Sequence, residues 1–242
     1  MRAVGLALAL CCSLAFAEAD KAPPAPIFLP RDEEIELALS AGPDHIRADA
    51  TVYTLGAAGY EKVRAGTNGF TCLVNRDGNQ NGDEDLKATC WDAEGSATIV
   101  PVMLRVGELI TQHKSADEIR RDINAGFSDH RFISPRKVGV AYMLRGDLRI
   151  DRKTKRLDRI FPPHYMIYAP GLTNDDLGLK HRSDIGRGTY ALPHVYSGYS
   201  GGAHTSYLMV FAIDVKTLEE QKPRFPTPAP ASPTATPPPM NH

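Results

Sequence analysis

Apolar residues recur at helical spacing in two adjacent segments near the middle of the chain. The first segment carries a proline near its start and an apolar stripe on one helical face: Pro101, Val102, Met103, Val106, Leu109 and Ile110. The second segment opens with Ser115 and Glu118 at capping-box spacing. Ile119 and Ile123 would form its buried stripe, and Gly126 is expected to end it as a C-cap. The pattern predicts two consecutive helices.

Alternating apolar and polar residues predict strands on both sides of this helical region. Ahead of it, residues 52–55 alternate, and Phe70, Cys72 and Val74 fall on one face of the run NGFTCLV. After it, alternation or short apolar runs predict further strands at 138–144, 148–150, 157–161, 165–168 and 207–213. The last run is apolar on both faces, which is typical of a central strand.

Two further helices and the order of all these elements predict the fold class. A helix should begin at Asp32, where Glu33 and Glu34 suit the positive end of its dipole, and end before Gly42. Residues 174–179 fit a short helix. Strands, then helices, then strands predict an α+β fold in one domain, with a largely antiparallel sheet and about three helices.

The two ends of the chain differ from this globular pattern. Residues 1–19 combine Arg2, an apolar run over 4–14 and small residues at two cleavage positions, which predicts a secretory signal peptide too short to span a bilayer. Cys11 leaves a lipoprotein anchor as the alternative, although Leu10 fits that motif poorly. We therefore expect a secreted or periplasmic protein, with no later transmembrane segment.

Proline sets the remaining boundaries. Residues 20–30 form a Pro-rich lead-in, 31–218 the single globular domain, and 219–242 a Pro-rich tail predicted to be disordered. The tail is either a passive extension or a spacer or ligand for a proline-binding partner. The 242 residues carry a formal net charge of -1, which disfavours nucleic acid as a partner.

The cysteine count changes once a signal peptide is removed. Cys11 and Cys12 would be lost, leaving Cys72 and Cys90. An even pair in an oxidising compartment predicts a disulfide, and two buried free thiols are the alternative.

The stretch between these cysteines resembles part of a calcium-binding loop. Oxygen-bearing residues occur at alternate positions around a glycine, as in an EF-hand: Asp77, Asn79, Asn81, Asp83 and Asp85. Ala88 stands where the bidentate glutamate should be, and a strand rather than a helix precedes the loop. Two interpretations stay open, a loose calcium site and a plain hairpin tip with two turn dipeptides, and the missing carboxylate favours the second.

Histidines in the C-terminal half are the other candidates for chemistry. The histidines occur at neither H-x-H nor H-E-x-x-H spacing, so the sequence predicts no zinc site. His164, Tyr168 and His204 could line one cleft and serve an envelope hydrolase or isomerase, but only if the fold brings them together.

Several stretches resemble a family of exported bacterial proteins that carry no assigned activity. They are HIRADATVYTLGAAGYEKVRAGTNGFTCLV, CWDAEGSATIVPVMLR, GVAYML and PPHYMIYAPGLTNDDLG, within residues 36–213. The resemblance implies a secreted or periplasmic single domain and supplies no catalytic residues. We therefore expect a non-catalytic domain that binds a small molecule or an envelope partner. The alternatives are the histidine enzyme and a calcium-stiffened structural module.

Overall fold

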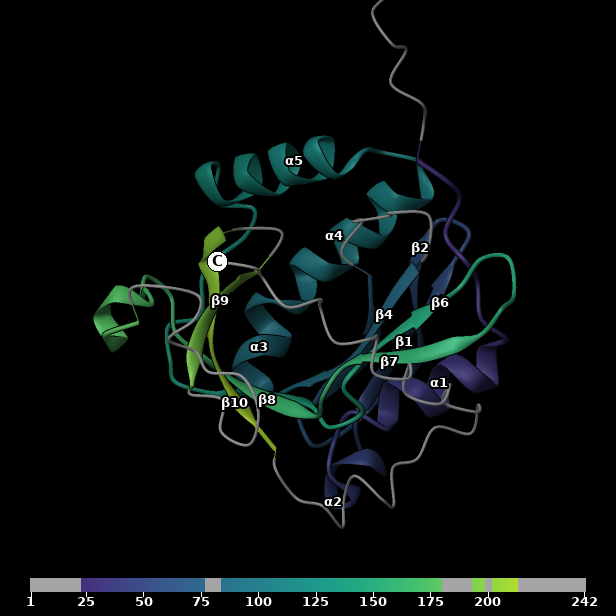
Figure 1. Cartoon of the computed structure of the whole chain (residues 1–242), viewed down its shortest axis with the longest axis horizontal. Helices are drawn as coiled ribbons and strands as arrows, with labels where there is room; N and C mark the ends of the chain where they lie inside the picture. The colour runs from purple at the N-terminus through teal and green to yellow at the C-terminus, as the bar shows by residue number, and fades with distance from the viewer. Residues whose placement is uncertain (1–22, 77–83, 180–192, 199–201, 213–242) are drawn as a thin grey trace, which may run out of the picture.

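A mixed, mostly antiparallel sheet of ten strands forms the centre of the protein, with helices on both faces (Figure 1). The structure is a computed structural model that describes residues 23–76, 84–179, 193–198 and 202–212. The predicted α+β class and antiparallel sheet are confirmed. No helix among the described residues is long and apolar enough to cross a membrane.

The strands follow the predicted alternation closely, with three additions. Their bounds are β1 Thr51–Gly56, β2 Gly59–Arg64, β3 Thr71–Asn75, β4 Glu84–Trp91, β5 Val140–Met143, β6 Asp147–Ile150, β7 Leu157–Phe161, β8 His164–Tyr168, β9 His194–Gly198 and β10 Gly202–Phe211. Eight lie in the order β2-β1-β3-β4-β5-β8-β10-β9, while β6 pairs with β4 and β7. Of the three strands not predicted, β2 forms a hairpin with β1, β4 follows the acidic loop and pairs with β3, and β9 pairs with β10. Strand β1 runs parallel to β3.

The helix count differs from the prediction of about three. The described residues contain α1 Arg31–Leu39, α2 Asp44–Arg47, α3 Ala93–Thr98, α4 Val100–Thr111, α5 Ala116–Ser128 and the 3-10 helix η1 Asp175–Leu177. Helices α2 and α3 are the additions, and each is too short to show a repeated apolar stripe. Helix α3 begins because the Asp92 side chain accepts a hydrogen bond from the Gly95 amide at 3.0 Å.

Helix α5 begins as predicted but ends later. The reciprocal capping box between Ser115 and Glu118 is present. Gly126 is wrong as a C-cap, because the helix continues to Ser128 and Asp129 is the C-cap. Gly126 instead makes room for a ring: a Cβ there would lie 2.4 Å from Phe132. Its role is close packing.

Two apolar clusters cover opposite faces of the sheet. One face packs on α1, and its buried members include Val52, Val74, Leu86, Ala88 and Leu148. The other packs on α3, α4 and α5, and its members include Leu73, Trp91, Val106, Ile123 and Tyr207. Because side chains alternate along a strand, neighbours such as Leu73 and Val74 belong to different clusters.

The predicted disulfide is confirmed between β3 and β4. Cys72 and Cys90 are directly opposite in the antiparallel pair and are bonded, with both residues fully buried. The bond faces the α1 side of the sheet, where the Cys90 sulfur lies 3.6 Å from the Ala38 carbonyl oxygen. It joins the two strands that flank the acidic loop.

A buried ionic network ties the lead-in to the domain. The Arg76 guanidinium lies 2.9 Å from a Glu34 oxygen and 2.7 Å from a Glu84 oxygen, and all three side chains are at most 1% exposed. The Ile27 amide donates to Glu84, and Arg76 donates to the Ile27 carbonyl at 3.2 Å. Residues near Ile27 are therefore hydrogen-bonded to the core rather than separate from it.

Candidate functional site

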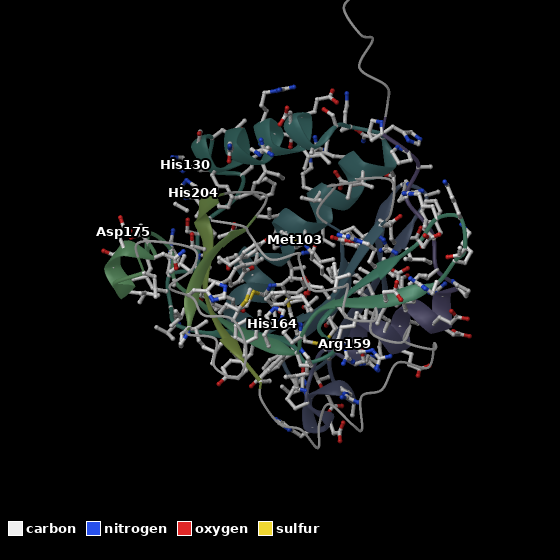
Figure 2. All side chains as sticks on the ribbon, in the orientation of Figure 1. Met103, His130, Arg159, His164, Asp175 and His204 are labelled. Carbon is white, nitrogen blue, oxygen red and sulfur yellow. A yellow bond between two sulfur atoms is a disulfide. The ribbon has the colours of Figure 1, made fainter. Side chains whose placement is uncertain are left out.

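A cavity of about 270 Å³ lies between α4 and the sheet. Helix α4 contributes Met103 and Val106 to its wall, and the remaining wall comes from the strands. Met103 and His164, which both line it, are labelled near the centre of the molecule in Figure 2. The volume is close to the lower end of the range of small-molecule pockets, about 300–1,000 Å³.

Strand alternation decides which side chains reach this cavity. On β4, Lys87, Thr89 and Trp91 face it, whereas the residues between them face α1. On β8, His164 and Met166 face it by the same two-residue period. The other strand residues that line it are Asn75, Met143, Asp147, Phe161, His194, Tyr196, Thr205, Tyr207 and Met209.

His164 is the buried titratable group of this site. Its residue is 1% exposed, and its Nδ1 lies 2.8 Å from the Pro162 carbonyl oxygen. Burial lowers the pKa of His164 to about 4, so the ring is neutral at neutral pH. A carbonyl only accepts, so Nδ1 carries the proton and donates it, which leaves Nε2 as the acceptor. Within the described part of the chain, Nε2 has no hydrogen-bond partner.

Further polar groups line one end of the cavity. The Asn75 Oδ1 atom is buried and has no hydrogen-bond partner among the described residues. Buried polar atoms are nearly always hydrogen-bonded, so such an acceptor suggests a group from outside the protein. Lys87 and Asp147 are directly opposite across the β4–β6 pair, and their formal charges cancel.

Aromatic residues, including Trp91 and Tyr207, also line the cavity. Trp91 Nε1 lies 3.5 Å from the Tyr207 hydroxyl oxygen, to which it donates. Burial raises the pKa of Tyr207 above its usual value, so its hydroxyl stays protonated. The cavity therefore combines apolar walls with a few polar groups, among them the oppositely charged Lys87 and Asp147, as ligand sites commonly do.

The three residues predicted for an enzyme do not share this cavity. Tyr168 lies on the same strand as His164, but its hydroxyl donates to Asp92 at 2.9 Å and to the Val140 carbonyl at 3.0 Å. His204 is exposed, stacks on Phe127 with ring centroids 4.5 Å apart, and lies at the α5 end of the molecule (Figure 2). Its Nδ1 is 2.9 Å from Ser134 Oγ. Of the three, only His164 lines the cavity.

The predicted calcium ligands fall mostly outside the described residues. Asp77, Asn79, Asn81 and Asp83 lie in the segment 77–83, which the structure does not describe. Asp85 is on β4, where its carboxylate oxygens accept from Arg149 at 2.6 and 3.1 Å. In the parts of the chain that are described, no three His, Cys, Asp or Glu residues are grouped to hold a metal.

A larger cavity lies on the opposite face of the sheet. It measures about 560 Å³ and is bounded by the lead-in, α1 and the β6–β7 hairpin. Its wall includes Ile27, Leu37, Leu86, Ile150 and Leu157, while Glu33, Glu36 and Lys155 are exposed. His164, with its unpartnered ring nitrogen, lines the cavity beneath α4 and not the larger one. The cavity beneath α4 is therefore the candidate site.

Sequence reasoning did not find most of this site. Methionines on β5, β8 and β10 line it, yet single methionines within strands resemble ordinary core residues. The available signal was alternation, which places His164 and Met166 on one face. No family model, curated protein or solved structure matches the chain. The resemblance to exported bacterial proteins therefore stays a prediction, and the functional argument depends on the site alone.

Proposed function

We propose that this protein binds a small ligand in the cavity beneath α4, as an exported domain of the bacterial envelope. The observation that carries the proposal is the neutral His164, whose Nε2 has no hydrogen-bond partner among the described residues and whose ring lines an apolar cavity. An acceptor in an apolar cavity gains a hydrogen bond when a ligand supplies a donor, so such a ligand would be favoured.

The export part of the proposal has two supports. The N-terminal residues have the pattern of a signal peptide. The Cys72–Cys90 disulfide is the kind of bond that persists in an oxidising compartment.

Binding is favoured over the enzyme alternative by the separation of the predicted catalytic residues. A hydrolase would need a base within hydrogen-bonding reach of a nucleophile in a cleft. Here Tyr168 donates to Asp92 and the exposed His204 contacts Ser134, and neither lines the cavity with His164. The function proposed is therefore limited to holding a ligand.

The experiment uses two small probes of similar size, phenol and toluene. The purified oxidised protein carries ¹³C-methyl methionine, because Met103, Met143, Met166 and Met209 all line the cavity. We expect both probes to shift these methyl signals and phenol to bind more tightly. One neutral hydrogen bond contributes about 0.5–1.5 kcal/mol, which is about a two- to tenfold preference.

His164→Phe is the matched variant, since it keeps a ring and removes the acceptor. It should retain toluene binding and lose the preference for phenol. Methyl signals that do not respond to either probe at saturating concentrations would refute the proposal. An unchanged preference for phenol in the variant would refute the role of His164.

A further inference from the structure

The strand register brings sulfur and imidazole side chains together on one face of the sheet. Met143 on β5 is directly opposite His164 on β8. Met166 on β8 is directly opposite Met209 on β10, and Met209 is directly opposite His194 on β9. We call these five residues the methionine–histidine array. All five line the cavity, and directly opposed residues have Cβ atoms about 4.5–5.5 Å apart.

The methionines are unusually concentrated at this place. The sequence has six, of which Met1 and Met240 lie outside the described residues. The other four all line this cavity, with Met103 approaching the array from α4. Each of these four residues is buried, so their side chains border one small space.

His164 makes the kind of hydrogen bond that is typical of a metal-binding histidine. Metal-binding histidines commonly donate one ring N–H to a carbonyl or carboxylate, which fixes the tautomer and presents the other nitrogen. The Pro162 carbonyl, 2.8 Å from Nδ1, does this for His164. Nε2 is then the nitrogen available to an ion.

The donor set selects the kind of ion. Thioether sulfur is a soft ligand that prefers Cu(I), whereas Ca²⁺ and Mg²⁺ prefer oxygen. Both cysteines of the described domain are consumed in the disulfide, so the array offers neutral donors only. Neutral donors suit a singly charged ion better than a doubly charged one, because burial of a charge is costly without opposite charge. The positive charge of Lys87 in the same cavity is offset by Asp147, directly opposite.

We propose that the methionine–histidine array binds a soft monovalent metal ion, Cu(I), through His164 Nε2 and the sulfurs of Met143, Met166 and Met209. This inference rests on the proposed function, because the ion must enter the same cavity. His194 is the second imidazole of the array, and Met103 covers the site from α4. Ag(I) has the same charge and softness without redox chemistry and is the probe of choice.

The test follows the ¹³C-methyl methionine signals of the oxidised protein during titration with Ag(I) in chloride-free buffer. We expect one equivalent of Ag(I) to shift the signals of Met143, Met166 and Met209, and Zn(II) at the same concentration to leave them unchanged. This measurement needs no variant, so it does not depend on whether a substituted protein folds.

Two variants then test the ligands directly. Mutation of a residue that only hydrogen-bonds to a metal ligand already lowers metal affinity by about 10–100-fold. Loss of a sulfur ligand in Met166→Leu or Met209→Leu should therefore weaken Ag(I) binding at least about tenfold. His204→Gln is the control, because that exposed histidine lies outside the cavity, and its affinity for Ag(I) should match wild type.

The outcomes separate the two proposals. Methyl signals that respond to phenol but not to Ag(I) would overturn the metal assignment and leave ligand binding intact. Signals that respond to neither would overturn both. Ag(I) binding that is unchanged in both leucine variants would also overturn the assignment, because the ion would then be held elsewhere.

Discussion

Met166 on β8 and Met209 on β10 are directly opposite each other in an antiparallel strand pair, and both line the cavity. The two residues are 43 positions apart in the sequence, so only the pairing of their strands brings them together. His164 lies two residues before Met166 on the same face, and we expect Ag(I) binding to depend most on these three residues.

Replacement of Met166 by leucine should separate binding from stability. Leucine and methionine are similar in volume, so the free energy of unfolding should change by less than about 1.5 kcal/mol. Ag(I) affinity should nevertheless fall at least about tenfold. Urea unfolding and Ag(I) titration measure the two quantities. Leu109→Met, a similar exchange in the same apolar cluster but outside the cavity, should leave Ag(I) affinity unchanged.

His164 should make stability depend on pH in a defined window. Its folded pKa is about 4 against an ordinary 6.5, so below pH 6.5 the unfolded chain takes up a proton that the folded protein does not. Above about pH 6.5, titration of His164 therefore does not change the free energy of unfolding. The free energy of unfolding decreases by up to about 3 kcal/mol as the pH falls toward 4.

Urea unfolding of wild type and His164→Gln at several pH values isolates this effect. The stability of wild type relative to the variant should decrease as the pH is lowered from 7 to 4. Two profiles that run parallel across this range would show that the ring is not held neutral by burial.

Arg76 should be among the most sensitive positions of the protein. Arg76→Ala would leave the buried Glu34 without its ionic partner and Glu84 with Arg152 alone, and breaking a buried ion pair typically costs about 3–5 kcal/mol. Arg120→Ala removes an exposed ion pair with Asp117 and should cost less than about 1 kcal/mol. Thermal or urea unfolding compares the two, and equal losses would contradict a buried role for Arg76.

The disulfide should stabilise the protein by lowering the conformational entropy of the unfolded chain. Cys72 and Cys90 are separated by 18 positions, and a loop of that size corresponds to about 3 kcal/mol in the chain-entropy model. Urea unfolding with and without reductant should show this difference. A Cys72→Ala/Cys90→Ala variant should resemble the reduced protein, and an identical midpoint for the oxidised and reduced forms would rule the contribution out.

Local patterns in the sequence were sufficient for much of the secondary structure. Helix α5 was predicted from the Ser115–Glu118 capping box and its apolar stripe, because both act within a few residues. Strands β6 and β7 were predicted at 148–150 and 157–161 from local apolar patterns. Helix α3, with six residues, has no repeating stripe, and its start depends on the single Asp92 cap.

Contacts between residues far apart in the chain could not be predicted from local patterns, because they depend on which elements pack and which strands pair. Glu34 was interpreted as a partner of the helix dipole, yet it is buried against Arg76, which lies 42 positions later. The array depends on β8 lying between β5 and β10, an order that alternation cannot supply. The strand predicted at 165–168 began after His164, and alternation could not place Met166 opposite Met209.

The most direct test of the binding site is a crystal structure of the protein grown with Ag(I), with the ion located by its anomalous scattering. Our account predicts one strong peak in the cavity beneath α4, in contact with His164 Nε2 and with the sulfurs of Met166 and Met209. A cavity without a peak, with Ag(I) bound only at surface residues such as His204, would contradict it.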